Sequence, residues 1–380
     1  MHLLDLFIGV AIRGHHFFED GWGDRAVCEA SDPEVLLRRR TRPIDVQLGA
    51  GKRAHGALLY DGSFQSPEER LPECARTAHV KVLLPAGEVR GMFVHLAASG
   101  DQGFGLRLRF AEPLVARGVG AVVLENPYYG ARRPKAQYAH QVRCVSDMHL
   151  MASATFLEGR SLLRWLRDEL GFERVGVTGY SMGGQLAAMV GAAMPFPVAV
   201  VPVAPACSPD SVLREGVLRH VPSWQKLAAA GEDEAAVREA LLGRASQFSV
   251  TSLPAPVYPE AAIVVGTSQD GFVPPSDMRR IAEHWGAELR WLPAGHVSAL
   301  LRHQGAMRQA MLDALARLES APLQRRRPRR ASTGELAKAA PPAKAPAQVA
   351  GGAAPLGRRD RPRSAAMRHR RALKRRGSRG

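Results

Sequence analysis

The segment Gly-Tyr-Ser-Met-Gly at residues 179–183 constrains the fold of this chain more than any other. It follows an apolar run and opens into a stretch of small residues, so the pattern predicts a serine on a tight turn between a strand and a helix. A side chain two residues to either side of that serine would collide with neighbouring backbone, and Gly179 and Gly183 relieve the collision. We therefore expect the Ser181 hydroxyl to stand above the end of a sheet, with the Met182 N–H aimed at the same space.

A serine on such a turn becomes a nucleophile only when a base takes its proton and a carboxylate orients that base. Two later apolar runs each end in a polar loop, and these loops carry Asp270 and His296. Serine, then acid, then histidine, each just after a strand, is the order found in α/β-hydrolases. We therefore predict a catalytic triad of Ser181, Asp270 and His296.

Each partner of the serine has an alternative role as a helix cap. Asp270 comes shortly before a predicted helix at residues 276–285, and His296 comes directly before a predicted helix at residues 297–312. Capping explains either residue alone, but it does not explain why both follow strands in the order that a triad needs.

The oxyanion hole of this kind of site needs a second N–H, normally from the loop after the third core strand. Residues 92–96 are predicted to form that strand and residues 97–101 the loop. We assign the oxyanion hole to the N–H groups of Met182 and Ala97, with the N–H of Ala98 as the alternative second donor, and we expect Ala98 to lie at the substrate.

Several segments give the chain a resemblance to a known family, the α/β-hydrolase-domain-containing protein 18 family of animals and bacteria. The segments are F-F-E-D-G-W-G at 17–23, V-H-L-A-A-S-G-D at 94–101, L-E-N-P-Y-Y-G-A-R-R-P at 124–134, V-S-D-M at 145–148, G-V-T-G-Y-S-M-G-G at 176–184 and A-G-H-V-S-A at 294–299. The run E-N-P-Y-Y-G-x-R-x-P is the most specific, because the general hydrolase fold does not require it.

The resemblance spans roughly residues 10–318 and implies an α/β-hydrolase with a serine nucleophile. It carries Ser181, Asp270 and His296 over as the catalytic set, and lipid acyl esters are a plausible substrate class for the family. One departure is visible, because the chain has Ala98 where the family's loop usually continues with glycine.

The segment at residues 125–134 follows a predicted strand, so it should lie at the same edge of the sheet as the serine. We predict that Tyr128, Tyr129 and Arg132 line the substrate pocket and suit a polar or anionic ester. The alternative is a rigid turn with exposed arginines.

Strands alternate with helical patterns along the chain, which predicts the α/β-hydrolase fold, a mostly parallel central sheet with helices on both faces and a small helical cap. The predicted strands occupy residues 79–84, 92–96, 119–124, 174–178, 197–203, 261–266 and 288–292. The predicted organisation begins with an N-terminal extension packed on the core (1–75). The hydrolase core follows in two parts (76–206 and 260–320), separated by a helical cap insertion (207–259) with helices at 211–220 and 233–242. The chain is predicted to end in a disordered basic tail (324–380).

The charge of the chain is concentrated in that tail. Residues 324–380 hold 18 Lys and Arg against two acids, a balance of +16 that equals the net charge of all 380 residues. The tail lacks the large apolar residues needed for a core, and it lacks the aromatic residues that stack on bases. It could bind an anionic surface, either membrane or nucleic acid, without specific nucleic-acid recognition. The alternative is a solubilising extension with no dedicated partner.

Other features narrow the class of protein further. The four cysteines are scattered and form no C-x-x-C pair, and no metal-ligand spacing appears, so we predict a cytoplasmic protein, peripheral to a membrane at most, with no metal or cofactor. The apolar run at residues 3–12 lacks signal-peptide features and is predicted to be a docked helix or one that grazes a membrane.

The predicted activity is therefore hydrolysis of a small-molecule or lipid ester. An amidase or peptidase with the same triad and a binding protein without enzymatic activity remain the alternatives, and the sequence does not set the oligomeric state.

Overall fold

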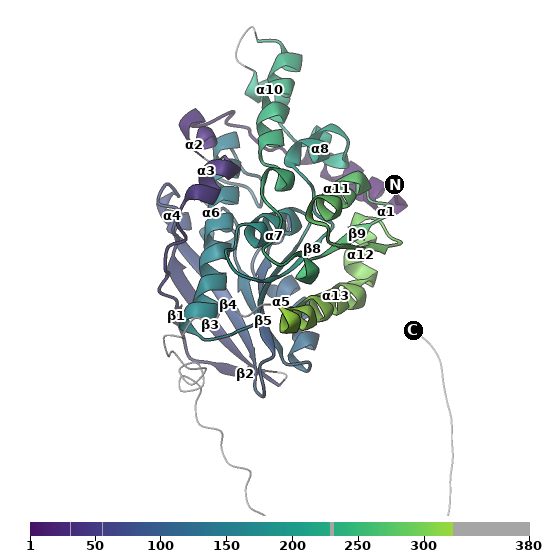
Figure 1. Ribbon diagram of the computed structural model, residues 1–380. Helices are drawn as coiled ribbons and strands as arrows, with labels where there is room; N and C mark the ends of the chain where they lie inside the picture. Colours follow the sequence, from purple (N-terminus) through teal and green to yellow (C-terminus); the bar gives the residue numbers. More distant parts are fainter. Residues whose placement is uncertain (31, 55, 229–231, 322–380) are drawn as a thin grey trace, which may run out of the picture. The chain divides into compact units, whose positions relative to one another are not determined.

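One mixed β-sheet organises the part of the chain that this computed structural model describes, residues 1–321 without residues 31, 55 and 229–231 (Figure 1). Its ten strands are β1 (Gln47–Leu48), β2 (Lys52–Ala54), β3 (Ala57–Gln65), β4 (Thr77–Pro85), β5 (Gly91–Leu96), β6 (Val119–Leu124), β7 (Val175–Tyr180), β8 (Ala199–Val203), β9 (Ile263–Thr267) and β10 (Glu288–Leu292). All seven strands predicted from the sequence are among them.

The strand order is β1-β3-β4-β6-β5-β7-β8-β9-β10, with β2 paired to β3. Pairing is antiparallel from β1 to β6 and parallel from β6 to β10, with Val94 of β5 opposite Val122 of β6 and Val177 of β7. The sheet is therefore parallel where the site residues were predicted and antiparallel where the N-terminal extension supplies β1–β3.

Helices connect the strands and cover both faces of the sheet. They are α1 (Leu3–Ala11), α2 (Arg25–Glu29), α3 (Pro33–Arg38), α4 (Glu73–Arg76), α5 (Gly105–Val115), α6 (Val145–Arg164), α7 (Met182–Ala192), α8 (Pro209–Arg214), α9 (Trp224–Leu227), α10 (Glu234–Gln247), α11 (Pro275–Trp285), α12 (His296–Arg302) and α13 (Gln304–Arg317). A π-helical turn, Trp165–Glu169, extends α6, and short 3₁₀ turns lie at Ile12–Gly14, Gly130–Arg132, Val217–His220, Val250–Ser252, Pro259–Ala261 and Leu318–Ser320.

The core consists of two layers of apolar side chains, one on each face of the sheet. On one face the residues of α6, α7 and α11 pack with Val94 and Val177, and on the other face α5 and α13 pack with Phe93 and Val201. Central strands buried on both faces must be apolar throughout, and all five residues of β8 are buried. The predicted α/β-hydrolase class, with helices on both faces, is confirmed.

Two predicted helices are each divided in the structure. The helix expected at residues 297–312 is α12 and α13, because the backbone of His303, with φ −114° and ψ 18°, leaves the helical conformation. The helix expected at residues 211–220 is α8 and a 3₁₀ turn, because Gly216 is extended and packs against the Phe272 carbonyl, 2.2 Å from where its Cβ would lie. Neither break is visible in the hydrophobic pattern.

The site sits where the order of the strands reverses. The chain leaves β5 through α5 to reach β6 on one side, and it leaves β6 through α6 to reach β7 on the other side of β5. Such a reversal opens a crevice at the carboxyl ends of the two central strands. Ala97 follows β5 and Ser181 follows β7, so both lie at this crevice.

The N-terminal segment forms α1, which contacts α12 and the 3₁₀ turn at Val217–His220 (Figure 1). The segment predicted as a basic tail, 324–380, lies outside the described residues, and the division of the body into core and cap stays a prediction. Among the residues that the structure describes, no helix combines the length and the apolar character needed to cross a bilayer.

Candidate active site

Ser181 occupies a strained turn between β7 and α7. Its backbone has φ 57° and ψ −119°, a conformation that residues with a side chain rarely adopt. The turn is anchored by the Ser181 N–H, which donates to the Val203 carbonyl on β8 at 2.9 Å. Strain of this kind persists only where the surroundings fix it, and it is concentrated at functional sites.

The glycines on either side of Ser181 are required by packing. A Cβ on Gly179 would lie 2.3 Å from the Gly183 carbonyl oxygen. A Cβ on Gly183 would lie 2.5 Å from the Leu96 carbonyl oxygen and 2.7 Å from that of Ala97. The second contact also shows that the end of β5 lies against the start of α7.

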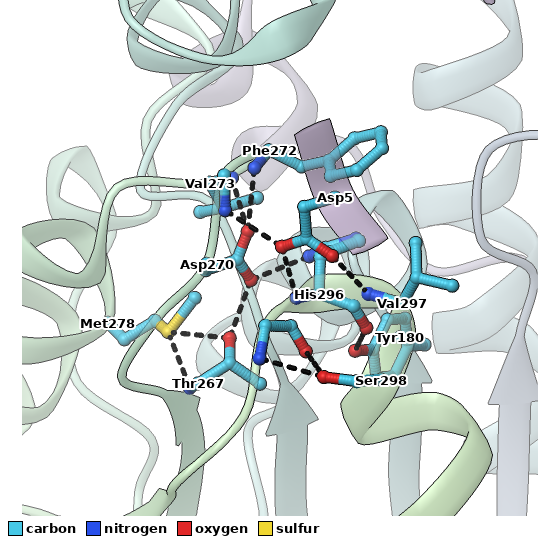
Figure 2. Close-up of polar contacts among 12 residues, drawn as sticks. Asp5, Tyr180, Thr267, Asp270, Phe272, Val273, Met278, His296, Val297 and Ser298 are labelled. Carbon is cyan, nitrogen blue, oxygen red and sulfur yellow. Dashed lines mark hydrogen bonds and ion pairs between the residues drawn. The ribbon is translucent and has the colours of Figure 1, made fainter. Parts of the chain in front are cut away.

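Asp270 and His296, which the sequence predicts as an acid–base pair, lie in hydrogen-bond contact. His296 Nδ1 lies 2.7 Å from Asp270 Oδ2, and both side chains are buried (Figure 2). Asp270 lies in the loop after β9, and His296 is the first residue of α12, just after β10. With Nδ1 bound to the carboxylate, Nε2 is the ring nitrogen left to serve as a base.

Asp270 is held by hydrogen bonds on both oxygens. Oδ1 accepts the N–H groups of Phe272 and Val273, each at 2.8 Å, and Oδ2 also accepts the Thr267 hydroxyl at 2.5 Å. Burial raises the pKa of Asp270, but His296 and these donors outweigh burial and hold the pKa below its ordinary value. The carboxylate is therefore ionised at neutral pH and can keep His296 in one tautomer.

Aromatic side chains fix the orientation of the imidazole. The ring of Phe272 stacks on that of His296 with centroids 4.9 Å apart, and Tyr180 meets it edge-on at 5.1 Å. The Tyr180 hydroxyl also donates to the backbone carbonyl of His296. Since Tyr180 immediately precedes Ser181, it ties the serine turn to the histidine loop.

Ser181 and His296, the predicted nucleophile and base, are not joined by a hydrogen bond. Over the described part of the chain, Ser181 Oγ bonds to no other group, and its residue is half-buried. Nucleophile–base contacts are often loose before substrate binds, so this geometry is compatible with a triad.

The two N–H groups assigned to the oxyanion hole stand on neighbouring elements. Met182 is the first residue of α7, where backbone N–H groups have no partner within the helix, and Ala97 follows β5 beside Gly183. Within the described residues, neither N–H donates a hydrogen bond. Both groups are therefore available to a developing oxyanion.

Ala98 and His95 lie at a small cavity beside the serine turn. This cavity of about 50 Å³ is also lined by Asp101 and Tyr180. His95 Nε2 is buried without a partner in the described part of the chain, and burial together with Arg107 lowers the pKa of His95 to about 3. His95 is therefore neutral and unsuited to transfer protons at neutral pH.

The other predicted substrate contacts have partners within the protein. Arg132 is fully buried, and its five N–H donors bond the carboxylate of Glu158 and the carbonyl oxygens of Ala75 and Glu125. This ion pair joins the segment at 125–134 to α6 and leaves no donor of Arg132 for another ligand.

Tyr128 and Tyr129 are also buried. The Tyr128 hydroxyl donates to Asp147 at 3.1 Å, and the Tyr129 hydroxyl accepts the Gly100 N–H at 3.3 Å. Tyr129 thereby supports the loop after β5 that contains Ala97. Contact of Tyr128, Tyr129 or Arg132 with substrate stays a prediction.

Sequence reasoning missed three residues that hold the acid–base pair: Thr267, Tyr180 and Asp5. Thr267 is the last residue of β9, three residues before Asp270, and Tyr180 is the last residue of β7, directly before Ser181. Their position near predicted site residues was a usable signal. Asp5 comes from α1, and its carboxylate accepts the backbone N–H of His296 at 2.6 Å. A charged residue inside an otherwise apolar run was the only signal for it. Within the described residues, no three His, Cys, Asp or Glu side chains are grouped to hold a metal ion.

The fold is similar to that of solved esterases. Acetyl xylan esterase 1 from Thermoanaerobacterium sp. JW/SL YS485 matches with a TM-score of 0.52 and 16% identity, over 83% of this chain and 99% of that one. An acetyl xylan esterase from Paenibacillus sp. R4 matches with a TM-score of 0.50 and 15% identity, over 80% and 99%. At so low an identity the likeness is evidence of the fold alone, and that fold is the α/β-hydrolase fold.

The sequence pattern of one family covers nearly all of the body. The family described as alpha/beta hydrolase domain containing 18 matches residues 15–241 and 228–317. These ranges include the serine turn, the loop after β5 and both members of the acid–base pair. The chain belongs to the alpha/beta hydrolase domain containing 18 family.

Proposed function

We propose that this protein is a serine hydrolase that cleaves carboxylic esters through Ser181, His296 and Asp270. The observation that carries the proposal is the 2.7 Å contact between His296 Nδ1 and an ionised, buried Asp270, at the same sheet edge as a serine on a strained turn. A buried carboxylate on the far nitrogen of an imidazole is the arrangement that makes the near nitrogen a base toward serine.

The chemistry follows from these positions. His296 Nε2 takes the Ser181 proton as Oγ attacks the ester carbonyl carbon, and the Met182 and Ala97 N–H groups bind the oxyanion. The tetrahedral intermediate expels the alcohol, which takes the proton from His296, and leaves an acyl group on Ser181. A water molecule repeats the sequence, with His296 again as base, and releases the acid. Asp270 stays ionised throughout and stabilises the imidazolium.

The substrate is a small-molecule or lipid ester. The two esterases compared above are named acetyl xylan esterases, so short acyl esters are the first substrates to test. A series of p-nitrophenyl esters from acetate to octanoate then compares short acyl groups with lipid-like ones.

The test combines turnover with covalent labelling. Ser181→Ala should lower hydrolysis of p-nitrophenyl acetate by at least about 10⁴-fold and abolish labelling by a fluorophosphonate, because the nucleophile is gone. Ser246→Ala is the matched control and should keep full activity, since Ser246 is an exposed serine in α10 whose hydroxyl donates to the Gly243 carbonyl.

Three other results would contradict the proposal. Full activity of Ser181→Ala would exclude this mechanism. A folded wild-type protein that neither labels nor turns over any ester would favour a binding protein on a hydrolase fold. Labelling of Ser181 with faster cleavage of p-nitroanilides than of matched esters would favour an amidase.

A further inference from the structure

The N-terminal helix α1 has apolar residues on its exposed side and a carboxylate on its buried side. Leu3 and Phe7 are 81% and 69% exposed, whereas Asp5 is fully buried. In the part of the chain that the structure describes, Asp5 makes no ion pair with Lys, Arg or His. A buried carboxylate is costly unless hydrogen bonds satisfy it, so its donors show what this residue does.

The donors of Asp5 are backbone N–H groups from the loop that carries Asp270 and from the first turn of α12, which begins at His296. Asp5 Oδ2 accepts the His296 N–H at 2.6 Å and the Gly271 N–H at 3.0 Å, and Oδ1 accepts the Val297 N–H at 2.9 Å (Figure 2). Gly271 directly follows Asp270. The Asp5 carboxylate therefore links the backbone directly after Asp270 to the backbone of His296.

The two loops are shaped to receive the start of α1. A Cβ on Gly271 would lie 2.6 Å from Met1 Cγ, and one on Gly295 would lie 2.3 Å from His2 Cβ and 2.6 Å from Asp5 Oδ2. The His2 N–H also donates to the Gln269 carbonyl at 2.8 Å. Glycine thus stands at two places where Met1, His2 and Asp5 come close to these loops, next to Asp270 in one loop and next to His296 in the other.

We propose that Asp5 is a positioning residue for the acid–base pair: it holds the backbone of Gly271 and His296 so that the imidazole meets both Asp270 and Ser181. The inference rests on the proposed function and assigns the N-terminal helix a part in it. The Tyr180 hydroxyl holds the carbonyl of His296, and Asp5 holds its N–H, so the main chain of the base is fixed from both ends. Small displacements of a catalytic base have large effects on rate.

The test replaces Asp5 by Asn, which keeps the size of the side chain but turns one acceptor into a donor. Asp5→Asn should lower kcat for p-nitrophenyl acetate by about 10- to 100-fold, with KM little changed, when rates are normalised to the active sites titrated with fluorophosphonate. Asp32→Asn is the matched control, because Asp32 also accepts a backbone N–H, that of Glu34 at 2.8 Å, at the start of α3. It should change kcat little.

A second readout follows the histidine itself and does not need turnover. The proton between His296 Nδ1 and Asp270 gives a downfield NMR signal, assigned by its loss in Asp270→Asn. This signal should shift or broaden in Asp5→Asn and stay unchanged in Asp32→Asn. If Asp5→Asn does not fold, Asp5→Ser, which is smaller and keeps one acceptor, should show the same loss.

The outcomes separate the two proposals. A wild-type kcat and an unchanged NMR signal in Asp5→Asn, with only a lower unfolding temperature, would reduce Asp5 to a helix cap and overturn the inference. A wild-type protein without labelling or turnover, whose histidine signal still responds to Asp5→Asn, would overturn the ester hydrolase and leave the positioning role standing.

Discussion

The two halves of the candidate site are held in different ways. On the acid–base side, Asp270 receives two backbone N–H groups, a hydroxyl and the imidazole of His296. On the serine side, the described residues offer no hydrogen bond to the Ser181 hydroxyl, and the turn is fixed by close packing at Gly179 and Gly183.

This difference matches the separate tasks that the proposed mechanism gives to the two halves. An orienting carboxylate has to keep one geometry throughout the reaction, which a full set of hydrogen bonds provides. In the proposed mechanism the serine has to be positioned for attack by its backbone, and its contact with the base can stay loose until substrate binds. Substitutions on the two sides should therefore fail for different reasons.

The largest effect is expected on the acid–base side, from Asp270→Asn. The amide cannot hold His296 in the tautomer that presents Nε2 as a base, so kcat should fall by about 10⁴-fold while the protein stays folded. Asp277→Asn is the control, since Asp277 is buried in α11 and accepts the Cys207 N–H at 2.8 Å and the Ser211 hydroxyl. An equal loss of kcat in both variants would mean that a general disturbance, and not the tautomer, caused it.

The serine side should respond to added volume. Gly183→Ala places a Cβ against the carbonyl oxygens of Leu96 and Ala97. These are backbone atoms, so a rotamer change cannot relieve the contact and the backbone has to shift. The Ala97 peptide should move, and displacement of one oxyanion donor should lower kcat by about 10²- to 10³-fold. Kinetics on p-nitrophenyl acetate measures this loss.

Gly243→Ala in α10 supplies the matched control for added volume. Outside its chain neighbours and the backbone of its own helix, its Cβ would meet no atom of the described residues within 4 Å, so kcat should not change and the free energy of unfolding should rise by about 0.5 kcal/mol. If Gly183→Ala retained full activity, the Ala97 N–H would not be an oxyanion donor.

The sequence was sufficient for the parts of the site whose signals are local. The glycines two residues from Ser181, and the strands that end before Asp270 and His296, can be recognised from short stretches of the sequence around them. Asp5 could not be found in this way, because it lies 291 residues from His296 and its partners are backbone groups without a residue-specific signal. For Arg132 the charge was visible, but its burial depends on Glu158, which only the folded chain brings within 2.6 Å.

The smallest effect concerns pH and again separates the two halves. On the serine side, burial and Arg107 lower the pKa of His95 to about 3, against about 6.5 in an unfolded chain. Between these pH values the unfolded chain binds one more proton at this residue, so stability is lost as pH falls below 6.5. As the pH falls from neutral to 5, protonation of His95 in the unfolded chain alone should lower the free energy of unfolding by about 2 kcal/mol.

His95→Gln removes this titration and tests it. In urea unfolding at pH 7.5 and pH 5, the variant should lose about 2 kcal/mol less than the wild type over that interval. His149→Gln should act in the same direction, since burial and then Arg244 lower the pKa of His149 to about 4. An unchanged pH dependence in His95→Gln would mean that His95 can take up its proton in the folded protein. The serine side would then be more polar than its packing indicates, and the contrast with the acid–base side would weaken.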